Sequence, residues 1–190
     1  MNSILSSRRT LLGEVSLPVG LGIVLFGTLL LTVSAKVQIP FLLVPVTMQA
    51  FVVLLLGMTL GWRLGGLTLL AYLAEGAMGL PVFAGTPEKG IGLAYMVGPT
   101  GGFLLGFFLA AVITGWLAER GWDRSIVGTA LAGLIGMVAI YFPGLVWLGT
   151  ALGWDNPILE WGFWPFWKFD LLKVALLAMV VPLAWRAKGQ

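Results

Sequence analysis

The stretch PTGGFLLGFFLAAVITGWL, residues 99–117, decides the fold class because it runs for 19 residues without a charge. A helix that crosses the hydrocarbon core of a membrane needs about 20 predominantly apolar residues. Similar stretches recur along the chain of 190 residues, of which 59% are hydrophobic and only 10% are charged. An ordinary soluble domain is roughly 25% charged. The sequence therefore predicts an all-α, polytopic membrane protein whose environment is the lipid bilayer.

Six apolar stretches set the expected organisation of the chain. We place the membrane-spanning helices at about 17–35, 47–60, 62–80, 99–117, 126–150 and 165–185. The second and third meet at Gly61, Trp62 and Arg63, so they must form a tight antiparallel hairpin. A long connection rich in proline and glycine follows, from Pro81 to about Val97. The chain is thus expected to be a single six-helix membrane domain over residues 1–190.

The positive charges test this count, because cytoplasmic loops of membrane proteins carry an excess of lysine and arginine. With six spans, both termini and the turns at 61–63 and 119–124 share one side, which holds all the arginines and Lys188. The opposite side holds Lys36, Lys89 and Lys168. This asymmetry predicts that both termini are cytoplasmic and that the chain is a multi-pass membrane protein. The turn that contains Asp123 is expected to be aqueous.

The composition excludes several kinds of site. The chain has no cysteine and no histidine, so thiolate zinc sites, iron–sulfur clusters and a Ser–His catalytic pair are ruled out. No lysine follows a glycine, so a phosphate-binding loop of the G-x-x-x-x-G-K-[ST] type is absent from the sequence. We therefore expect no cofactor in this chain, no nucleic-acid partner and no enzymatic activity, although a carboxylate site of Asp170 with Glu75 keeps an enzyme conceivable. The energy for any transport must come from a partner.

Ionisable residues inside membrane spans are costly and are functional candidates by default. Asp170 and Lys173 lie three residues apart in the sixth span, which places them on one face of a helix. Together they offer a ligand an acceptor and a donor; the alternative is a salt bridge that only neutralises two charges. Lys36 and Gln49 are expected at the same depth, near the outer side of the membrane. The alternative role of Lys36 is an anchor at the membrane interface, and the alternative role of Gln49 is to satisfy backbone groups of the preceding loop. Glu75 is more simply explained as structural.

Two glycine-rich segments leave two interpretations open. The run Gly98-Pro99-Thr100-Gly101-Gly102 opens the fourth span, and the missing side chain at Gly101 can let backbone N–H groups approach a bound polar group. Helix–helix contact through small residues is the other interpretation. In the first span, Gly20, Gly22 and Gly27 form a thin face that can admit a neighbouring helix of this chain or of another protein.

Four motifs carry a resemblance to a known family. They are Pro45-Val46-Thr47-Met48-Gln49, then Gly79-Leu80-Pro81-Val82-Phe83-Ala84-Gly85, then the segment 98–107, and finally Pro165-Phe166 followed by Asp170 and Lys173. In order and spacing they are similar to the motif series of the BioY family, over about 35–178. The resemblance implies a six-helix S component of an energy-coupling factor (ECF) transporter. Such a component binds biotin with high affinity and usually works with a transmembrane T component and two ATPase subunits.

On this resemblance we expect the chain to serve biotin uptake across the bacterial cytoplasmic (inner) membrane, with biotin held between the outer ends of the helices. Another small vitamin-like molecule on the same fold and a purely structural subunit are the alternatives. Asp170 is expected to accept from the ureido N–H groups, Lys173 to donate to the ureido carbonyl or the carboxylate, and Gln49 to do either. The expected ligand-binding residues are Asp170, Lys173, Gln49, Lys36, Val82, Phe83, Tyr95 and Gly101, and the expected partner-binding residues are Gly20, Gly22 and Gly27.

Overall fold

The computed structural model describes residues 10–12, 15–39 and 44–188 of the chain. Its helices are α1 (Leu17–Lys36), α2 (Gln49–Ala77), α3 (Gly92–Met96), α4 (Gly101–Ala118), the 3-10 helix η1 (Trp122–Arg124), α5 (Ile126–Leu152), α6 (Ile158–Gly162) and α7 (Trp167–Ala187). Two short strands, β1 (Gln38–Ile39) and β2 (Val46–Thr47), pair antiparallel with Gln38 opposite Thr47. The all-helical class predicted from the sequence is confirmed. The strand pair ties the segment after α1 to the segment before α2.

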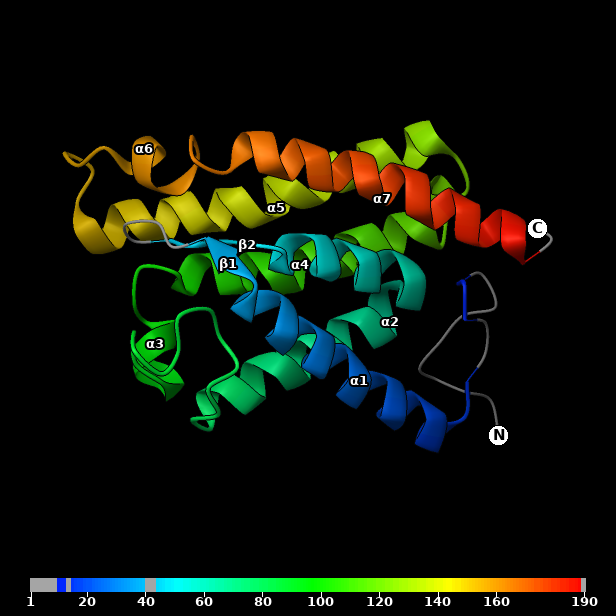
Figure 1. Ribbon diagram of the computed structural model, residues 1–190, viewed down its shortest axis with the longest axis horizontal. Helices are drawn as coiled ribbons and strands as arrows, with labels where there is room; N and C mark the ends of the chain where they lie inside the picture. Colours follow the sequence, from blue (N-terminus) through cyan, green and yellow to red (C-terminus); the bar gives the residue numbers. More distant parts are fainter. Residues whose placement is uncertain (1–9, 13–14, 40–43, 189–190) are drawn as a thin grey trace.

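Helix α2 reverses direction at one residue. Gly61 has φ +79 and ψ 172, a conformation that side chains with a Cβ rarely adopt, and it divides α2 into two arms. A Cβ built on Gly65 would lie 3.2 Å from Cα of Gly57. In a straight helix these residues would be about 12 Å apart along the axis, so the contact requires the arms to fold back on each other, as Figure 1 shows. The hairpin expected at 61–63 is present.

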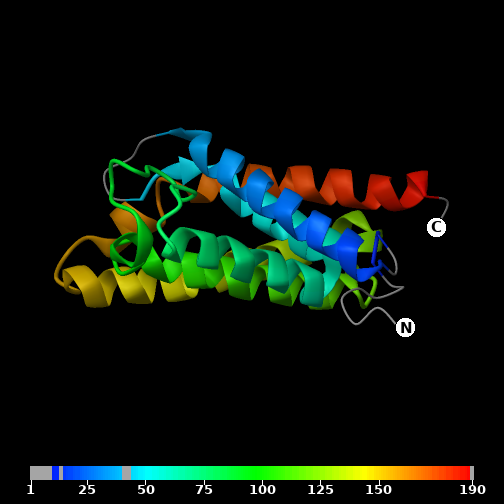
Figure 2. The ribbon, with the colours of Figure 1, turned by 90° about the horizontal axis from the view of Figure 1, so that it is seen from below.

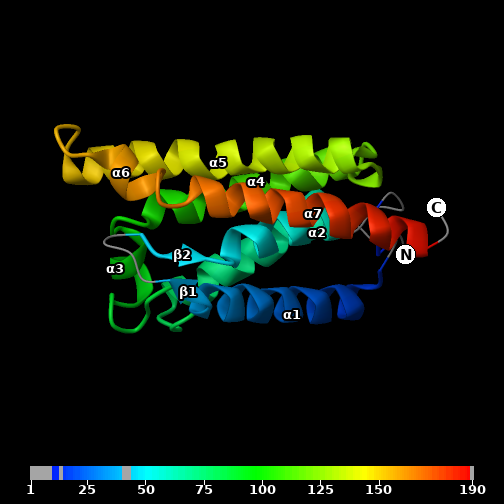
Figure 3. The ribbon, with the colours of Figure 1, turned by 45° about the horizontal axis from the view of Figure 1, so that its top comes forward.

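The long helices run back and forth between the two ends of an elongated molecule (Figures 1 and 3). One end holds the start of α1, the turn in α2, η1 and the end of α7, and the other holds the strand pair, α3 and α6. Among the described residues, the helices long and apolar enough to cross a membrane are α1, α2, α4 and α5. α7 is less apolar because it carries Lys168, Asp170, Lys173 and Arg186. That all six segments cross a membrane stays a prediction.

Helices α2 and α4 form the centre of the bundle, because the most extensive packing is between these two and between α4 and α5. The close approach depends on glycine, since a Cβ on Gly115 would lie 2.5 Å from the backbone nitrogen of Trp62. Met58 and Leu64 are fully buried there. α1 lies across the outside of the bundle (Figure 2) and leaves apolar side chains such as Leu25 exposed.

One residue expected in an aqueous turn is buried instead. Asp123, in η1, is 1% exposed, and its Oδ2 accepts a 2.6 Å hydrogen bond from Nε1 of Trp185. Its Oδ1 has no hydrogen-bond partner. The turn between α4 and α5 therefore fastens the last turns of α7. Burial disfavours the charged carboxylate and raises the pKa of Asp123 to about 6.

Candidate functional site

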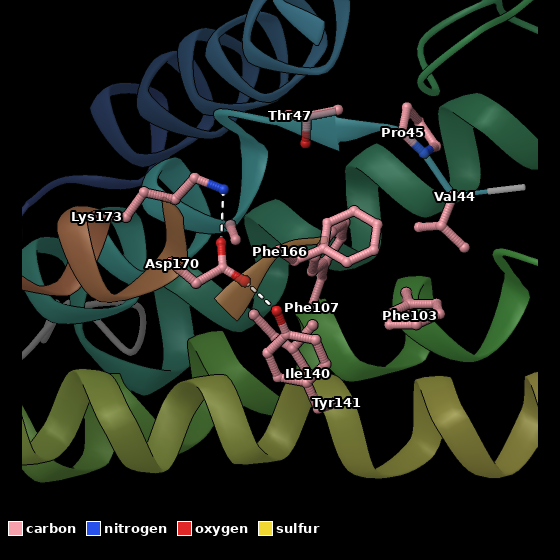
Figure 4. A pocket seen from close by; sticks show the side chains of 11 residues that line it. Val44, Pro45, Thr47, Phe103, Phe107, Ile140, Tyr141, Phe166, Asp170 and Lys173 are labelled. Atoms are coloured by element: carbon pink, nitrogen blue, oxygen red, sulfur yellow. Dashed lines mark hydrogen bonds and ion pairs between the residues drawn. The ribbon is translucent and has the colours of Figure 1, made fainter. Parts of the chain in front are cut away.

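Three polar side chains form one hydrogen-bonded cluster near the start of α7. Asp170 lies in the first turn of α7 and Lys173 one turn later, so both side chains leave the same face of the helix. Lys173 Nζ donates to Asp170 Oδ1 at 2.7 Å. The hydroxyl of Tyr141, on α5, donates to the other carboxylate oxygen, Oδ2 (Figure 4). Asp170 and Lys173 are each only 7% exposed.

Tyr141 is a member of this cluster that the sequence reasoning missed. The signal was present, because Tyr141 is a tyrosine in the middle of a stretch of α5 without charged residues. What the sequence could not supply is the pairing of α5 with α7, which places position 141 opposite position 170. The ring of Tyr141 is fixed by edge-to-face contacts with Phe103 and Phe163, at centroid distances of 6.4 and 5.1 Å.

Two small cavities lie beside the cluster and share part of their walls. The first, of about 60 Å³, is bordered by Asp170, Lys173, Tyr141, Ala50, Ile140 and Phe166, and the second, of about 40 Å³, by Gln49, Tyr95, Ala84, Thr100 and Leu104. Val44, Pro45, Thr47, Phe103 and Phe107 line both cavities. Figure 4 shows the first cavity, with the Asp170–Lys173 pair on one side and, facing it, Phe103 and Phe107 of α4 and the residues around β2. The structure thus brings Asp170, Lys173, Gln49 and Tyr95 around one divided space.

Gln49 is held by a short chain of hydrogen bonds at the start of α2. Its Nε2 donates to the hydroxyl of Tyr72 at 2.7 Å, and that hydroxyl donates to the carbonyl oxygen of Val82 at 2.9 Å. Gln49 is 3% exposed. The amide therefore borders the second cavity in a fixed orientation, and Val82 contributes its backbone carbonyl to hold it there.

Lys36, Val82 and Phe83 organise the loop that follows α2 and line neither of these two cavities. Lys36 Nζ donates to the carbonyl oxygens of Phe83 and Thr86, at 3.0 and 2.8 Å, and to Thr86 Oγ1 at 2.9 Å. Phe83 stacks on Tyr95 at a centroid distance of 5.0 Å. Lys36 therefore fixes the loop, because an ammonium group satisfies several carbonyl oxygens at once.

Tyr95 is the one expected apolar wall residue that reaches the divided space. Its hydroxyl donates to the carbonyl oxygen of Ala84 at 2.8 Å. Burial raises the pKa of the Tyr95 hydroxyl, so the group stays a neutral donor in the physiological range.

Gly101 serves packing in this structure. Its backbone N–H already donates to the carbonyl oxygen of Gly98 at 3.0 Å. A Cβ at position 101 would overlap the carbonyl oxygen of Met96 and lie 3.1 Å from Nε1 of Trp147. The contact interpretation of this glycine therefore fits the geometry, and its place beside a ligand stays a prediction.

The three glycines of α1 do not share a face, so the expectation of one thin partner-binding face is corrected. A Cβ on Gly27 would lie 2.5 Å from Cγ2 of Thr68, on α2, and Gly20 is also buried. Gly22 has no atom within 4 Å of such a Cβ. Positions 20 and 27 are about two turns apart and point the same way, whereas position 22 points away from them. Only Gly22 is turned outward.

An apolar groove of about 420 Å³ lies on the other side of the cluster, between α5 and α7. Tyr141 and Asp170 line this groove as well as the first cavity. The remaining lining is apolar and includes Val138 and Phe142, which are 66% and 72% exposed. The hydrogen bond between Tyr141 and Asp170 therefore separates the outer groove from the inner cavity.

The cluster can hold a polar ligand without an uncompensated charge. Asp170 neutralises Lys173, and both of its oxygens already accept a hydrogen bond. Lys173 keeps two further N–H donors, and each carboxylate oxygen keeps a second lone pair. A mostly apolar space with a few converging polar groups is the usual form of a small-molecule site.

Comparison with known proteins gives a consistent result. The model of the BioY family matches residues 12–190. The biotin transporter BioY of Thermotoga maritima is 40% identical over 153 residues, which cover 80% of this chain and 88% of that protein. The probable biotin transporter BioY of Pyrococcus horikoshii is 36% identical over 151 residues, 80% of this chain and 86% of that protein.

A solved structure shares the fold. The crystal structure of the S-component for biotin from an ECF-type ABC transporter superposes with a TM-score of 0.74, covering 91% of this chain and 92% of that one. The two sequences are 24% identical, so this likeness concerns the arrangement of the helices.

Proposed function

The chain belongs to the BioY family, and from this premise we propose that it binds biotin and takes part in its uptake across the cytoplasmic membrane. The proposal rests on one observation in the structure, the buried Asp170–Lys173–Tyr141 cluster at the edge of an apolar cavity. Relatives at 40% and 36% identity are named as a biotin transporter and a probable biotin transporter. These names favour transport over an enzymatic reaction.

The chemistry of the cluster suits the two polar parts of biotin. The ureido ring carries two N–H donors and a carbonyl acceptor, and the valerate tail carries a negative charge. Lys173 has donors for the ureido carbonyl or for the carboxylate, while the remaining lone pairs of Asp170 can accept from the ureido N–H groups. Gln49 borders the second cavity and offers a further polar contact.

Binding must move the wall that divides the site. Pockets that enclose a small molecule usually measure roughly 300–1,000 Å³, whereas the two cavities measure about 60 and 40 Å³. Because Val44, Pro45, Thr47, Phe103 and Phe107 line both cavities, displacement of these residues joins the cavities into one. We infer that the segment 44–47, which includes strand β2, makes this movement.

We further propose that six helical segments cross the membrane with both termini in the cytoplasm. The alternation of the helices between two ends supports this topology, as does the concentration of arginines at the end that holds η1 and the turn in α2. Single cysteines can be placed at exposed positions of this cysteine-free chain. Cysteines at Arg124 and Lys188 should be shielded from an impermeant reagent outside the cell, whereas cysteines at Lys89 and Asn156 should be labelled. Labelling at Arg124 from outside would refute the topology.

Concentrative uptake requires a source of free energy, and we propose that an ECF T component and ATPase subunits supply it. The sequence has no phosphate-binding loop with its lysine. The solved structure with the same fold is the S-component of an ECF-type ABC transporter. Accumulation of labelled biotin above the outside concentration by proteoliposomes that contain this chain alone would refute the need for partners.

Calorimetric titration of the purified chain with biotin tests the proposal directly. We expect saturable binding of one biotin per chain that is weakened by Lys173→Ala. The control variant is Lys168→Ala, which removes an exposed lysine of the same helix outside the two cavities and should bind as wild type does. Absence of binding to biotin, with binding to another vitamin-like molecule, would assign the site to that molecule instead.

A further inference from the structure

A second groove lies on the outside of the bundle, between the second arm of α2 and α4. Its volume is about 420 Å³, and it is lined by Trp62, Arg63, Gly66, Leu67, Leu70, Phe108 and Val112. None of these residues lines the cavities around Asp170. At its floor the two helices are close, because a Cβ on Gly66 would lie 3.0 Å from Cγ2 of Val112. Leu70 is 50% exposed, so the groove opens away from the bundle.

The groove has a cationic end and an apolar end. The guanidinium carbon of Arg63 lies 5.1 Å from the centre of the Trp62 ring. On α4, Trp116 lies four residues beyond Val112 and therefore extends the same wall. The guanidinium carbon of Arg120 lies 3.3 Å from the centre of the Trp116 ring. Two tryptophan–arginine pairs thus stand at the end near the turn in α2.

The other end of the groove is apolar. Leu67, Leu70 and Phe108 line it and carry no polar side-chain atom. The carboxylate of Glu119, the residue that follows α4, lies at the cationic end, because its Oε1 would be 2.5 Å from a Cβ on Gly61 at the turn in α2. The two arginines at that end outnumber it. A molecule that fits along the whole groove therefore has an anionic head and an apolar tail.

The length of the groove matches one leaflet of a membrane. From Trp62 to Leu70 the helix advances about 12 Å at 1.5 Å per residue. One leaflet contributes about half of a hydrocarbon core that is roughly 30 Å thick. Tryptophan is enriched at the membrane interface, and arginine on its cytoplasmic side, so the two pairs stand at the depth of lipid headgroups.

We propose that this groove binds a phospholipid with a net negative headgroup, held at Arg63 and Arg120, with one acyl chain along Gly66, Leu70 and Phe108. Guanidinium groups bind phosphate through paired hydrogen bonds, which a lysine does not match. Basic pockets between membrane helices on the cytoplasmic side are typical binding sites for anionic headgroups. The site is independent of the proposed biotin site.

Lipid titration followed by native mass spectrometry tests the assignment. The purified chain in detergent is titrated with phosphatidylglycerol and, separately, with phosphatidylcholine of the same acyl chains. We expect wild type to bind phosphatidylglycerol more tightly. The double variant Arg63→Gln, Arg120→Gln should lose this preference, by about fivefold in affinity for each arginine. Leu70→Trp fills the apolar end and should reduce the binding of both lipids.

A matched control separates this site from general surface charge. Lys168 is also an exposed cation beside a tryptophan, with Nζ 5.6 Å from the centre of the Trp167 ring. It belongs to the first turn of α7, which begins away from the end that holds the turn in α2 (Figure 1). Lys168→Gln should keep the wild-type preference. Equal binding of the two lipids by wild type, or an unchanged preference in the double variant, would overturn the proposal. Unchanged lipid binding by Leu70→Trp together with loss of copurified coupling subunits would assign the groove to a protein partner and would also overturn it.

Discussion

Tyr141→Phe removes a single oxygen atom from the site. The change deletes the hydrogen bond from the tyrosine hydroxyl to Oδ2 of Asp170 and leaves the salt bridge with Lys173 at Oδ1 in place. The ring keeps its contacts with Phe103 and Phe163. The variant therefore measures what the hydroxyl contributes, without opening a cavity or leaving an unpaired charge.

The size of the effect follows from the type of hydrogen bond that is lost. A hydrogen bond to a charged group contributes about 1.5–3 kcal/mol, so we expect the free energy of unfolding to fall by that amount. A carboxylate held at one oxygen fixes Lys173 less firmly, and we expect the dissociation constant of biotin to rise about tenfold, which corresponds to ~1.4 kcal/mol. Tyr95→Phe is the matched control. It removes a hydroxyl that donates to a neutral carbonyl oxygen and should cost about 1 kcal/mol of stability.

A double-mutant cycle tests the assignment of the effect to Asp170. Biotin affinity is measured by calorimetry for wild type, Tyr141→Phe, Asp170→Asn and the double variant. If the hydroxyl acts through the carboxylate, Tyr141→Phe should cost much less in the Asp170→Asn background than in wild type, because the two changes remove one interaction. Equal costs in both backgrounds would refute the reasoning.

Three further predictions concern the charge pair, helix α1 and the buried turn. Lys173→Ala should weaken biotin binding by about 2–5 kcal/mol, because it leaves Asp170 without its cation and removes a ligand donor; wild-type affinity by calorimetry would contradict the site. Gly27→Leu should lower the free energy of unfolding in detergent by about 1–3 kcal/mol through overpacking, whereas Gly22→Leu should not. Copurification of coupling subunits with each variant shows whether Gly22, which points outward, contacts a partner. The raised pKa of Asp123, about 6 against a usual 3.8, means that the folded state binds the proton more tightly than the unfolded state, so this group stabilises the fold at low pH. That stability should decline between about pH 4 and about pH 6 by ~3 kcal/mol at most, and Asp123→Asn should remove this part of the pH dependence of thermal unfolding.

The helices could be predicted from the sequence because their signals are local. Apolar stretches bounded by charged or glycine-rich turns indicate where helices begin and end, and Gly61 marks a reversal that glycine tolerates. The exposure of Asp123 was predicted wrongly because that prediction also used only local signals. A charged residue in a short turn is usually exposed, and its burial depends on Trp185, which lies 62 residues later in the chain.

The polar residues of the site could also be predicted from their local spacing, whereas the residues that form its walls could not. Asp170 and Lys173 share a helical face at a spacing of three, and the structure pairs them. Val82 and Phe83 line neither of the two cavities beside the cluster, and their contact with a ligand stays a prediction. Which way a loop turns its side chains depends on contacts that periodicity does not encode. In this loop the contacts come from Lys36 and Tyr72. The biotin contacts themselves stay a prediction.

Tyr141 and Asp170 line both the inner cavity and the groove between α5 and α7. On the side of α5, these two side chains therefore form the wall between the cavity and the groove. In a membrane, hydrocarbon chains would fill the outer groove. The charge pair, whose Asp170 lines that groove, would then sit beside a medium of low dielectric constant, where electrostatic attraction is stronger than in water. The ring of Tyr141 then separates the lipid from the inner cavity, in addition to positioning the hydroxyl that donates to Asp170. Shortening it to alanine would differ in kind from removing its hydroxyl, because it would open the wall between the groove and the inner cavity. Acyl chains would then reach the cavity itself, and biotin affinity would come to depend on the composition of the surrounding bilayer.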